Sequence, residues 1–287
     1  MKYLIIGNHG QLGTQFEKYF SNSNIVHKGV DIDEIDVGDS EDVMKLISSL
    51  KPDCVINCSA FTLVDDAEKD TISAYRTNAD GVRNLAQACE KYRSFLVHYS
   101  TDYVFDGEKT DGLYTELDPT NPINHYGKSK LQGELFLKDN LENYLLFRLS
   151  WVFGNGKNNF IYKFLQWCEN NPYLKISCDE TSVPTYTKTV LEVTIKALEQ
   201  QLTGLYHLTN SGYASRYEWA KAIVKAKKID KFIYPISKNI FNLPARRPTF
   251  SAMSNKKISR ELNIKIPDWE EAIFEFICND RFNTINS

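Results

Sequence analysis

The sequence lacks several features that mark specialised protein classes. Its six cysteines are scattered without a Cys-x-x-Cys pair or a His-rich spacing, so we expect small core residues in a reducing compartment and no zinc or other metal site. No apolar run approaches the roughly 18 residues of a membrane span, and the apolar start of the chain is too short for a signal peptide. We therefore expect no membrane partner and a cytoplasmic protein.

An excess of basic residues is also missing. The 287 residues carry a net charge of -3 at pH 7, and no basic run is suited to following a phosphate backbone. The sequence therefore predicts no nucleic-acid partner. Its 42% hydrophobic and 25% charged residues are ordinary for a globular enzyme or binding protein with a sizeable core.

What the chain does have begins with a strand, a glycine turn and a helix. The apolar run 3–6 leads directly into Gly7, Gly10 and Gly13, and a helical pattern follows. Glycine is needed where the backbone turns tightly and where it approaches a pyrophosphate or packs closely on a strand. The helix N-terminus then offers free N–H groups to the phosphates. The pattern predicts a dinucleotide site.

The second strand is expected at 24–28, and the residues that follow it bear on the choice between NADH and NADPH. Asp31 follows it, near the place where an acid hydrogen-bonds the adenine ribose hydroxyls of NAD. A solvated acidic loop is the alternative, because several more acids follow. Lys28 could instead meet a 2′-phosphate, so NADH and NADPH both stay open.

Strands and helices alternate through the first half of the chain. Strand-like runs at 54–58, 94–99 and 144–149 alternate with helical patterns such as 41–50 and 72–92. This order predicts an α/β fold, a Rossmann-type doubly wound parallel sheet with helices on both faces. Ligands of such sheets bind beyond the carboxyl ends of the strands. Polar clusters follow these ends at 59–62, 100–103 and 150–151.

Tyr126 and Lys130 lie four residues apart on a helix that should begin near His125, after Pro122. Residues at this spacing share a helical face, so the ammonium can approach the phenol and lower its pKa from about 10. Such a phenol would donate a proton near neutral pH. An ordinary amphipathic helix is the alternative interpretation.

Four motifs follow one another along the chain: the GxxGxxG turn, STDYVFDG at 100–107, YGKSKLQGE at 126–134 and RLSWVFG at 148–154. Together they resemble the extended short-chain dehydrogenase/reductases and, within them, the dTDP-4-dehydrorhamnose reductase family. Further matches at 57–65, 77–79, 183–185 and 245–251 extend the resemblance over nearly the whole chain.

The resemblance implies a catalytic trio of Thr101, Tyr126 and Lys130. In such enzymes NADPH or NADH delivers hydride to the C4 carbonyl carbon of a nucleotide-linked 6-deoxy-4-ketohexose, and Tyr126 would protonate the carbonyl oxygen. Thr101 would hydrogen-bond that oxygen, and Lys130 would tune Tyr126 and hold the nicotinamide ribose. The implied reaction is reduction of dTDP-4-dehydro-L-rhamnose to dTDP-L-rhamnose, in polysaccharide biosynthesis.

The resemblance also implies binding residues. Those along the cofactor are Gly7, Gly10, Gln11, Leu12, Gly13, Asp31, Asp39, Ser40, Ser59, Ala60, Phe61, Asn78, Tyr126 and Lys130. Those at the nucleotide-sugar substrate are Thr101, Asp102, Tyr126, Trp151 and Arg247. Simpler explanations exist for some of them: Trp151 could be core, Asp102 could cap a turn, and Asp39 with Ser40 could cap the next helix. Arg247 could clamp a diphosphate or be surface charge beside a turn.

Two positions narrow the chemistry. Related dehydratases follow the active-site threonine with Asp-Glu, whereas Tyr103 follows Asp102 here, so dehydration is disfavoured. Glu180 stands where the reductase pattern has glutamine, which allows a different nucleotide or 4-ketosugar. A non-catalytic dinucleotide-binding subunit, like the β subunit of methionine adenosyltransferase, is a further alternative, although an intact catalytic trio argues against it.

The second half of the chain should build a smaller, interwoven substrate-binding domain. We expect a dinucleotide-binding Rossmann domain at 1–148 plus about 172–205, and the substrate-binding domain at about 149–171 plus 206–287. The expected partner is the nucleotide-sugar substrate, and a homodimer is an open alternative.

Overall fold

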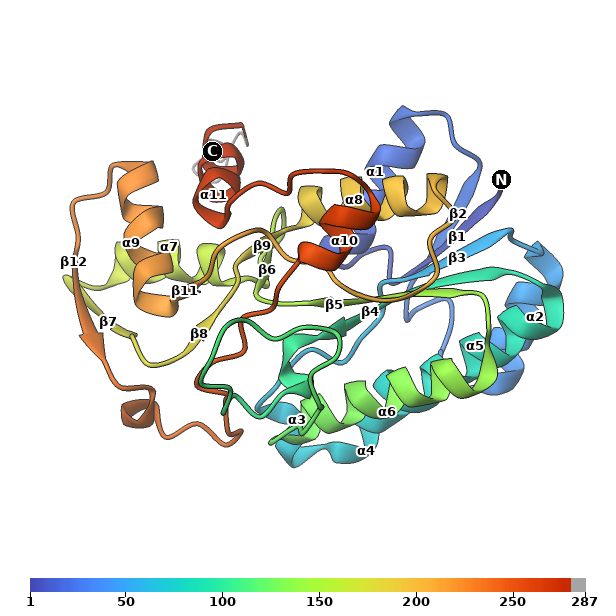
Figure 1. Cartoon of the computed structure of the whole chain (residues 1–287), viewed down its shortest axis with the longest axis horizontal. Coiled ribbons are helices and arrows are strands. Elements are labelled where there is room, and N and C mark those ends of the chain that lie inside the picture. The colour runs from blue at the N-terminus through green and yellow to red at the C-terminus, as the bar shows by residue number, and fades with distance from the viewer. Residues whose placement is uncertain (280–287) are drawn as a thin grey trace.

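A six-stranded parallel sheet forms the centre of the computed structural model, which describes residues 1–279 (Figure 1). Across the sheet the strands are β10 (Gly204–His207), β5 (Tyr144–Leu149), β4 (Phe95–Thr101), β3 (Cys54–Asn57), β1 (Tyr3–Ile6) and β2 (His27–Val30). Strand β1 pairs with β2 on one side and β3 on the other. The chain therefore reverses its winding at β1, and such a switch point is where ligands bind in open α/β sheets.

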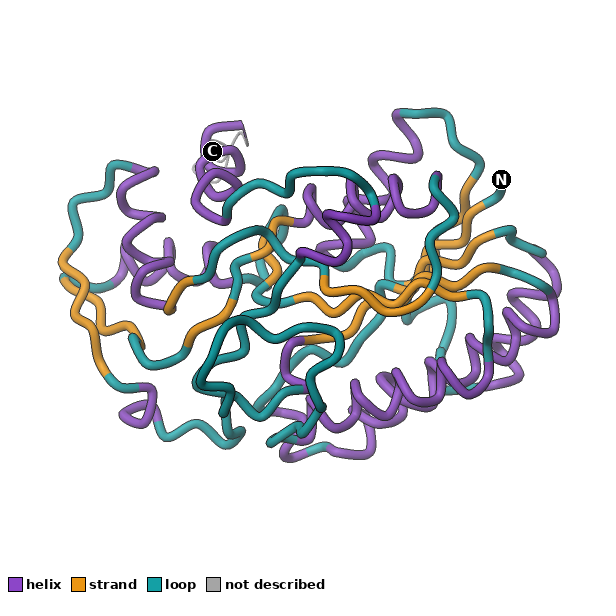
Figure 2. The backbone as a smooth tube through the Cα atoms, viewed as in Figure 1, coloured by secondary structure: helices purple, strands orange, loops and turns teal. Residues whose placement is uncertain are grey.

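Helices cover both faces of this sheet, as Figure 2 shows. On one face α1 (Gln11–Asn22), α8 (Thr187–Glu199) and α10 (Lys256–Glu261) bury residues such as Phe16, Val190 and Ile258 against the strands. On the other face α2 (Ser40–Leu50), α5 (Gly81–Tyr92) and α6 (His125–Asn140) bury apolar residues in a second core. The predicted Rossmann-type α/β fold is confirmed.

The connection from β3 to α5 is helical throughout most of its length. Short helices α3 (Asp66–Lys69) and α4 (Thr71–Tyr75) lead into a π-helical turn, η1 (Arg76–Asp80), which continues into α5. The predicted helix at 72–92 is therefore a continuous helical segment that contains one π-helical turn. A 3₁₀ turn, η2 (Asp102–Val104), follows β4 and carries its polar carboxyl end.

A third core lies beside the sheet and comes from the second half of the chain. It contains α7 (Phe160–Asn170), α9 (Arg216–Lys227) and α11 (Trp269–Asn279), with β7 (Tyr173–Ser177) paired to β12 (Phe232–Ile236). The 3₁₀ turn η3 (Lys238–Phe241) follows β12. Two small ladders connect this part to the sheet: β6 (Val152–Phe153) with β9 (Thr185–Tyr186), and β8 (Thr181–Ser182) with β11 (Ala214–Ser215).

Two sequence predictions differ from the structure. The second strand was expected at 24–28 but begins at His27, because Asn24 adopts a left-handed turn (φ 53°) after α1. Strand β12 was not predicted, since Pro235 interrupts its apolar pattern and is tolerated only at an edge. Strand β7 pairs with β12 and lies outside the six-stranded sheet. Strand β10 belongs to that sheet, and α8 packs against one of its faces. The division of the chain into two domains stays a prediction. Within residues 1–279, no helix combines the length and apolar character needed to cross a membrane.

Candidate active site

The glycine turn between β1 and α1 has the shape that a pyrophosphate requires. Gly7 has a φ of +79°, and a Cβ atom there would lie 2.7 Å from the backbone nitrogen of Ser59. A Cβ atom at Gly13 would lie 2.0 Å from the carbonyl oxygen of Gly7. Helix α1 begins after Gly10 with no side-chain cap and no acid in its first turn. Its N–H groups and positive dipole end are therefore free for phosphates, and these residues fit a dinucleotide.

The loop after β3 lies against this turn and is joined to α6. Ser59 follows β3 beside Gly7, and the peptide groups of Phe61 are held by the Asn78 amide, which accepts from the nitrogen (2.9 Å) and donates to the oxygen (3.0 Å). The same amide donates to the Ser129 hydroxyl on α6 (3.0 Å). Ala60 lies between these fixed points. The structure thus brings this predicted cofactor segment to the carboxyl end of the sheet.

Gln11 and Leu12 begin α1 but differ in surroundings. The Gln11 side chain accepts a hydrogen bond from the Asn159 amide (2.8 Å) and so joins the turn to the loop before α7. Leu12 packs against the core on the α1 face of the sheet. Only the peptide group of Leu12 is therefore suited to a phosphate, whereas Gln11 lies beside the second half of the chain.

The carboxyl end of β2 is acidic. The Asp31 carboxylate accepts from the backbone nitrogens of His9 and Ile32, each at 2.8 Å. The Lys28 ammonium lies 3.0 Å from the Glu34 carboxylate, so its charge is already paired. Asp31 remains available for ribose hydroxyls, and this end of the sheet offers little attraction to a 2′-phosphate. Three side chains at this end, those of His9, Asp31 and Asp33, each carry an atom that could ligate a metal ion, and these atoms lie within 4.8 Å of one another.

Asp39 and Ser40 lie at the N-terminus of α2. The Asp39 carboxylate accepts from the backbone nitrogens of Glu41 (2.8 Å) and Asp42 (3.2 Å), so it caps the helix. Ser40 is the exposed first residue of that helix. The capping explanation accounts for the geometry of Asp39, and a contact with the cofactor stays a prediction for both residues.

Thr101 and Tyr126 lie at the carboxyl end of β4, Thr101 as its last residue and Tyr126 in the first turn of α6. Asn124 caps α6 by accepting from the backbone nitrogen of Gly127 (2.7 Å). A Cβ atom at Gly127 would lie 2.2 Å from the carbonyl oxygen of Tyr103, so only glycine lets α6 approach this closely. The rings of Tyr103 and Tyr126 then pack edge to face, 5.9 Å apart.

Burial controls the pKa values of the predicted catalytic pair. Desolvation raises the pKa of Tyr126 to about 12, and the nearby Thr101 hydroxyl opposes this only in part. Burial lowers the pKa of Lys130 to about 8, with the Glu134 carboxylate opposing. The prediction that Lys130 lowers the pKa of Tyr126 is wrong, because the ammonium donates to the carbonyl oxygen of Tyr99 (2.7 Å) and removal of the phenol from water dominates.

Asp102 is buried beside Thr101 and accepts three hydroxyl donors. One carboxylate oxygen accepts from Thr101 (3.2 Å), and the other accepts from Ser182 (2.8 Å) and Ser251 (2.5 Å). Desolvation raises the pKa of Asp102 to about 6, opposed by these hydroxyls and by the charge of Arg216. Its carboxylate is therefore enclosed by protein groups and turned away from solvent.

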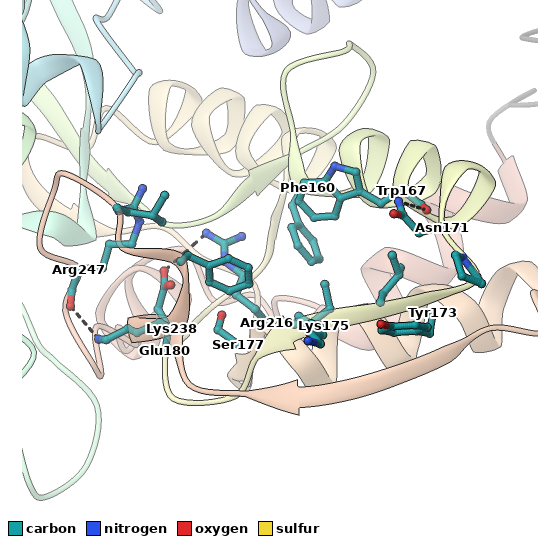
Figure 3. Close-up of a pocket in the computed structure, with 15 residues that line it drawn as sticks. Phe160, Trp167, Asn171, Tyr173, Lys175, Ser177, Glu180, Arg216, Lys238 and Arg247 are labelled. Carbon is teal, nitrogen blue, oxygen red and sulfur yellow. Dashed lines mark hydrogen bonds and ion pairs between the residues drawn. The ribbon is translucent and has the colours of Figure 1, made fainter.

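A pocket of about 710 Å³ lies between α7, β7 and the segment from η3 to Arg247. Figure 3 shows Glu180, Lys238 and Arg247 at one end, Trp167 and Tyr173 at the other, and Arg216 between them. The remaining lining residues are Phe160, Asn171, Pro172, Leu174, Lys175, Ile176, Ser177, Phe241 and Leu243. The pocket thus has a charged end and an aromatic end.

The charged end is also the end nearest Tyr126. The Tyr103 hydroxyl donates to the buried Glu180 carboxylate (3.4 Å), and Tyr103 packs on Tyr126. The Arg216 guanidinium lies over the Trp151 ring, 3.7 Å from its centre, and 3.8 Å from Glu180. Trp151 is half-buried with a φ of +40° and stacks on a second tryptophan behind it. Trp151 therefore supports the arginine that faces the pocket.

Carboxylates already pair two of the pocket's cations, Arg216 with Glu180 and Arg247 with Asp65. Arg247 forms a two-pronged ion pair with Asp65 (2.6 and 3.1 Å), which fixes it between the loop after β3 and the pocket. Lys238 donates to the carbonyl oxygen of Arg247 (2.9 Å). Arg216 and Lys238 were not predicted as site residues, because no local motif marks them and only packing of the second half of the chain brings them together.

Comparison with known proteins agrees with this geometry. The family model described as RmlD substrate binding domain matches residues 1–282. A dTDP-4-dehydrorhamnose reductase of Burkholderia thailandensis is 35% identical, with 95% of this chain and 97% of that protein covered. A crystal structure of such a reductase from Clostridium acetobutylicum superposes with a TM-score of 0.94 at 35% identity, covering 97% of this chain and 99% of that one.

A second crystal structure, a dTDP-4-dehydrorhamnose reductase from Bacillus anthracis in complex with NADP, superposes with a TM-score of 0.93 at 32% identity. It covers 97% of this chain and 99% of the other. The resemblance seen in the sequence motifs is thereby confirmed. The chain belongs to the RmlD family of dTDP-4-dehydrorhamnose reductases, within the extended short-chain dehydrogenase/reductases.

Proposed function

We propose that the protein reduces the C4 ketone of dTDP-4-dehydro-L-rhamnose with NADPH or NADH, giving dTDP-L-rhamnose. The observation that carries this proposal is the position of Tyr126, packed edge to face on Tyr103 at the carboxyl end of β4, on the sheet edge that also holds the glycine turn. A proton donor and a dinucleotide site at one edge are what ketone reduction requires.

The bound nicotinamide supplies the hydride, and the chain supplies the proton. Tyr126 is the proton donor to the oxygen that becomes the C4 hydroxyl, and its raised pKa keeps the phenol protonated throughout the neutral range. Thr101 donates a hydrogen bond to the incoming oxygen, and for this its hydroxyl turns away from Asp102. Lys130 holds the nicotinamide ribose, and its charge supports the tyrosinate that remains after proton transfer.

The cofactor binds along the edge defined by β1, β2 and β3. Gly7, Gly10 and Gly13, with the peptide groups of Gln11 and Leu12, hold the pyrophosphate, and Asp31 accepts from the adenine ribose. The remaining contacts come from Asp39, Ser40, Ser59, Ala60, Phe61 and Asn78.

The pocket fits a nucleotide sugar in one orientation. The aromatic end, with Trp167 and Tyr173, suits a base, and the charged end, with Arg216 and Arg247, suits a diphosphate. The charged end lies next to Tyr103 and hence Tyr126, so the sugar beyond the diphosphate reaches the proton donor, beside Trp151. Binding would release the two arginines from Glu180 and Asp65.

The test is oxidation of reduced nicotinamide, followed by absorbance, on adding dTDP-4-dehydro-L-rhamnose generated in situ. We expect ketosugar-dependent oxidation by the wild type and almost none by Tyr126→Phe. Glu180 supports a second candidate, a different nucleotide-linked 4-ketosugar, because its carboxylate faces the pocket. Faster oxidation with another 4-ketosugar would favour that candidate, and cofactor binding without oxidation by any of them would contradict both.

The domain division, a cytoplasmic location and a homodimer stay predictions of the proposal. In it, residues 1–148 and about 172–205 hold the cofactor, and the rest holds the substrate. Measuring the mass of the protein in solution would decide whether it is a homodimer.

A further inference from the structure

We infer that Gln11 is a positioning residue that ties the cofactor turn to the substrate pocket, so that the dinucleotide and a nucleoside diphosphate strengthen each other's binding. The inference rests on the proposed function, because it takes the diphosphate of the nucleotide sugar as a ligand of the pocket. It gives the Gln11 side chain a role other than the predicted contact with the cofactor.

The Gln11 side chain uses both ends of its amide on the second half of the chain. Its oxygen accepts from the Asn159 amide (2.8 Å), and its nitrogen donates to the backbone carbonyl oxygen of Val152 (3.4 Å). Gln11 is also the first residue of α1, the helix that offers its free N–H groups to a pyrophosphate. Gln11 therefore belongs to the cofactor turn by its backbone and to the second half of the chain by its side chain.

Asn159 is a fully engaged anchor at the start of α7, and it is 6% exposed. Its amide nitrogen also donates to the carbonyl oxygens of Gly154 (3.0 Å) and Gly156 (2.9 Å). Its oxygen caps α7 by accepting from the backbone nitrogen of Tyr162 (3.0 Å). A shift of Gln11 is therefore passed both to the loop at 154–159 and to the first turn of α7.

Both hydrogen bonds of this glutamine end beside the rings that hold Arg216. Asn159 directly precedes Phe160, and Val152 directly follows Trp151. The Arg216 guanidinium lies 3.7 Å from the centre of the Trp151 ring and 5.2 Å from that of the Phe160 ring. Phe160 and Arg216 both line the pocket (Figure 3). The glutamine thus fixes, from the cofactor side, the aromatic support on which the pocket presents a positive charge.

Each ligand constrains one end of this connection. A pyrophosphate at the helix N-terminus holds the cofactor turn, and a diphosphate drawn to Arg216 holds the rings that support this arginine. The first ligand orders contacts that the second would otherwise have to order, so the second binds at a lower entropic cost. Linkage makes the effect equal in both directions. Repulsion between the two anionic ligands acts in the opposite sense, so mutual strengthening is a distinctive result.

The test measures dTDP binding by isothermal titration calorimetry, with and without saturating reduced cofactor, NADH or NADPH as the wild type prefers. For the wild type we expect bound cofactor to lower the Kd of dTDP about fivefold or more, which is the usual size of coupling between sites. Gln11→Met keeps the length of the side chain but removes both hydrogen bonds. In this variant the cofactor should no longer change the Kd of dTDP, whereas cofactor affinity without dTDP should be nearly unchanged.

Two further variants make the test specific. Gln15→Met is the same change one turn later on α1, at a glutamine whose side chain makes no hydrogen bond within residues 1–279, and it should keep the wild-type coupling. Asn159→Ser keeps an oxygen that caps α7 but removes the amide donor, so it should lose the coupling. If Gln11→Met does not fold, as seen by circular dichroism, Asn159→Ser carries the test.

The possible results separate this inference from the proposed function. Equal dTDP affinity with and without cofactor in the wild type would overturn the inference and leave the proposed function standing. Coupling that survives in folded Gln11→Met or Asn159→Ser, or is lost in Gln15→Met, would do the same. A loss of about tenfold or more in the cofactor affinity of Gln11→Met without dTDP would show a direct cofactor contact and also overturn it. No dTDP binding by the wild type would defeat the proposed substrate, and the inference with it.

Discussion

The Lys130 ammonium lies 2.7 Å from the backbone carbonyl oxygen of Tyr99 and is 2% exposed. This contact ties the middle of α6 to β4 and holds the charge beneath the site. It also explains why the phenol of Tyr126, one turn earlier, keeps a high pKa: the ammonium is directed at the strand. In the proposed enzyme Lys130 therefore acts on the nicotinamide ribose and on the tyrosinate formed during reduction.

Replacing Tyr126 with Phe should remove most turnover, roughly 100-fold or more, because the proton donor is lost. Cofactor affinity should be nearly unchanged, since the ring remains in place against Tyr103. Steady-state oxidation of the cofactor and its dissociation constant by fluorescence measure the two effects. A near-normal rate would show that another group protonates the ketone.

Lys130→Met should weaken both turnover and cofactor binding. Because burial lowers the pKa of Lys130 to about 8, the ammonium loses its proton as pH rises above that value, and wild-type kcat/KM should decline there. The methionine variant should lack this alkaline decline. Unchanged cofactor affinity in Lys130→Met would remove the ribose contact from the account.

Asp31→Asn should shift the cofactor preference toward NADPH. The carboxylate at the end of β2 accepts well from ribose hydroxyls but repels a 2′-phosphate, and the nearby Lys28 is paired with Glu34. The ratio of kcat/KM for NADPH to that for NADH, in wild type and variant at the same ionic strength, measures the shift. A constant ratio would place the adenine ribose elsewhere.

Glu180→Gln should lower KM for the dTDP-sugar several-fold. The carboxylate is buried at the charged end of the pocket, where it opposes a diphosphate and competes for Arg216. The effect should shrink in high salt. A KM that rises instead would mean that Glu180 is needed to hold Arg216 on Trp151.

Asp102→Asn should alter how stability depends on pH. The folded pKa of about 6 lies above the ordinary value of 3.8, so the native state favours the protonated form. The wild type, compared with the variant, should therefore lose up to about 3 kcal/mol of unfolding free energy as pH rises from about 4 to about 6. Urea unfolding at a series of pH values measures this difference, which should be constant above that range. No change across it would show that Asp102 is not desolvated.

The sequence predicted the fold because its signals are local. The apolar first strand, the glycine turn and the helix beginning near His125 each follow from neighbouring residues and were confirmed, whereas the second strand begins later than predicted. The trio of Thr101, Tyr126 and Lys130 came from motifs on adjacent elements, and the structure brings them to one sheet edge. Their roles stay proposals.

What the sequence could not predict depends on packing between distant segments. Ser182 and Ser251 lie 80 and 149 residues from Asp102, yet both donate to it. Arg216 carries no motif and reaches the pocket only because α9 packs beside Trp151. The pKa of Tyr126 was wrongly predicted for the same reason, since helical spacing shows the neighbour at i+4 but not the burial that outweighs it.

The most direct test of the account is the fate of the hydride. Reduced cofactor carrying deuterium at the transferable C4 position of the nicotinamide is incubated with enzyme and dTDP-4-dehydro-L-rhamnose, and the product is examined by nuclear magnetic resonance. The account predicts deuterium at C4 of the new rhamnose and at no other sugar carbon. Product with no deuterium at C4, or no product while the cofactor still binds, would contradict it.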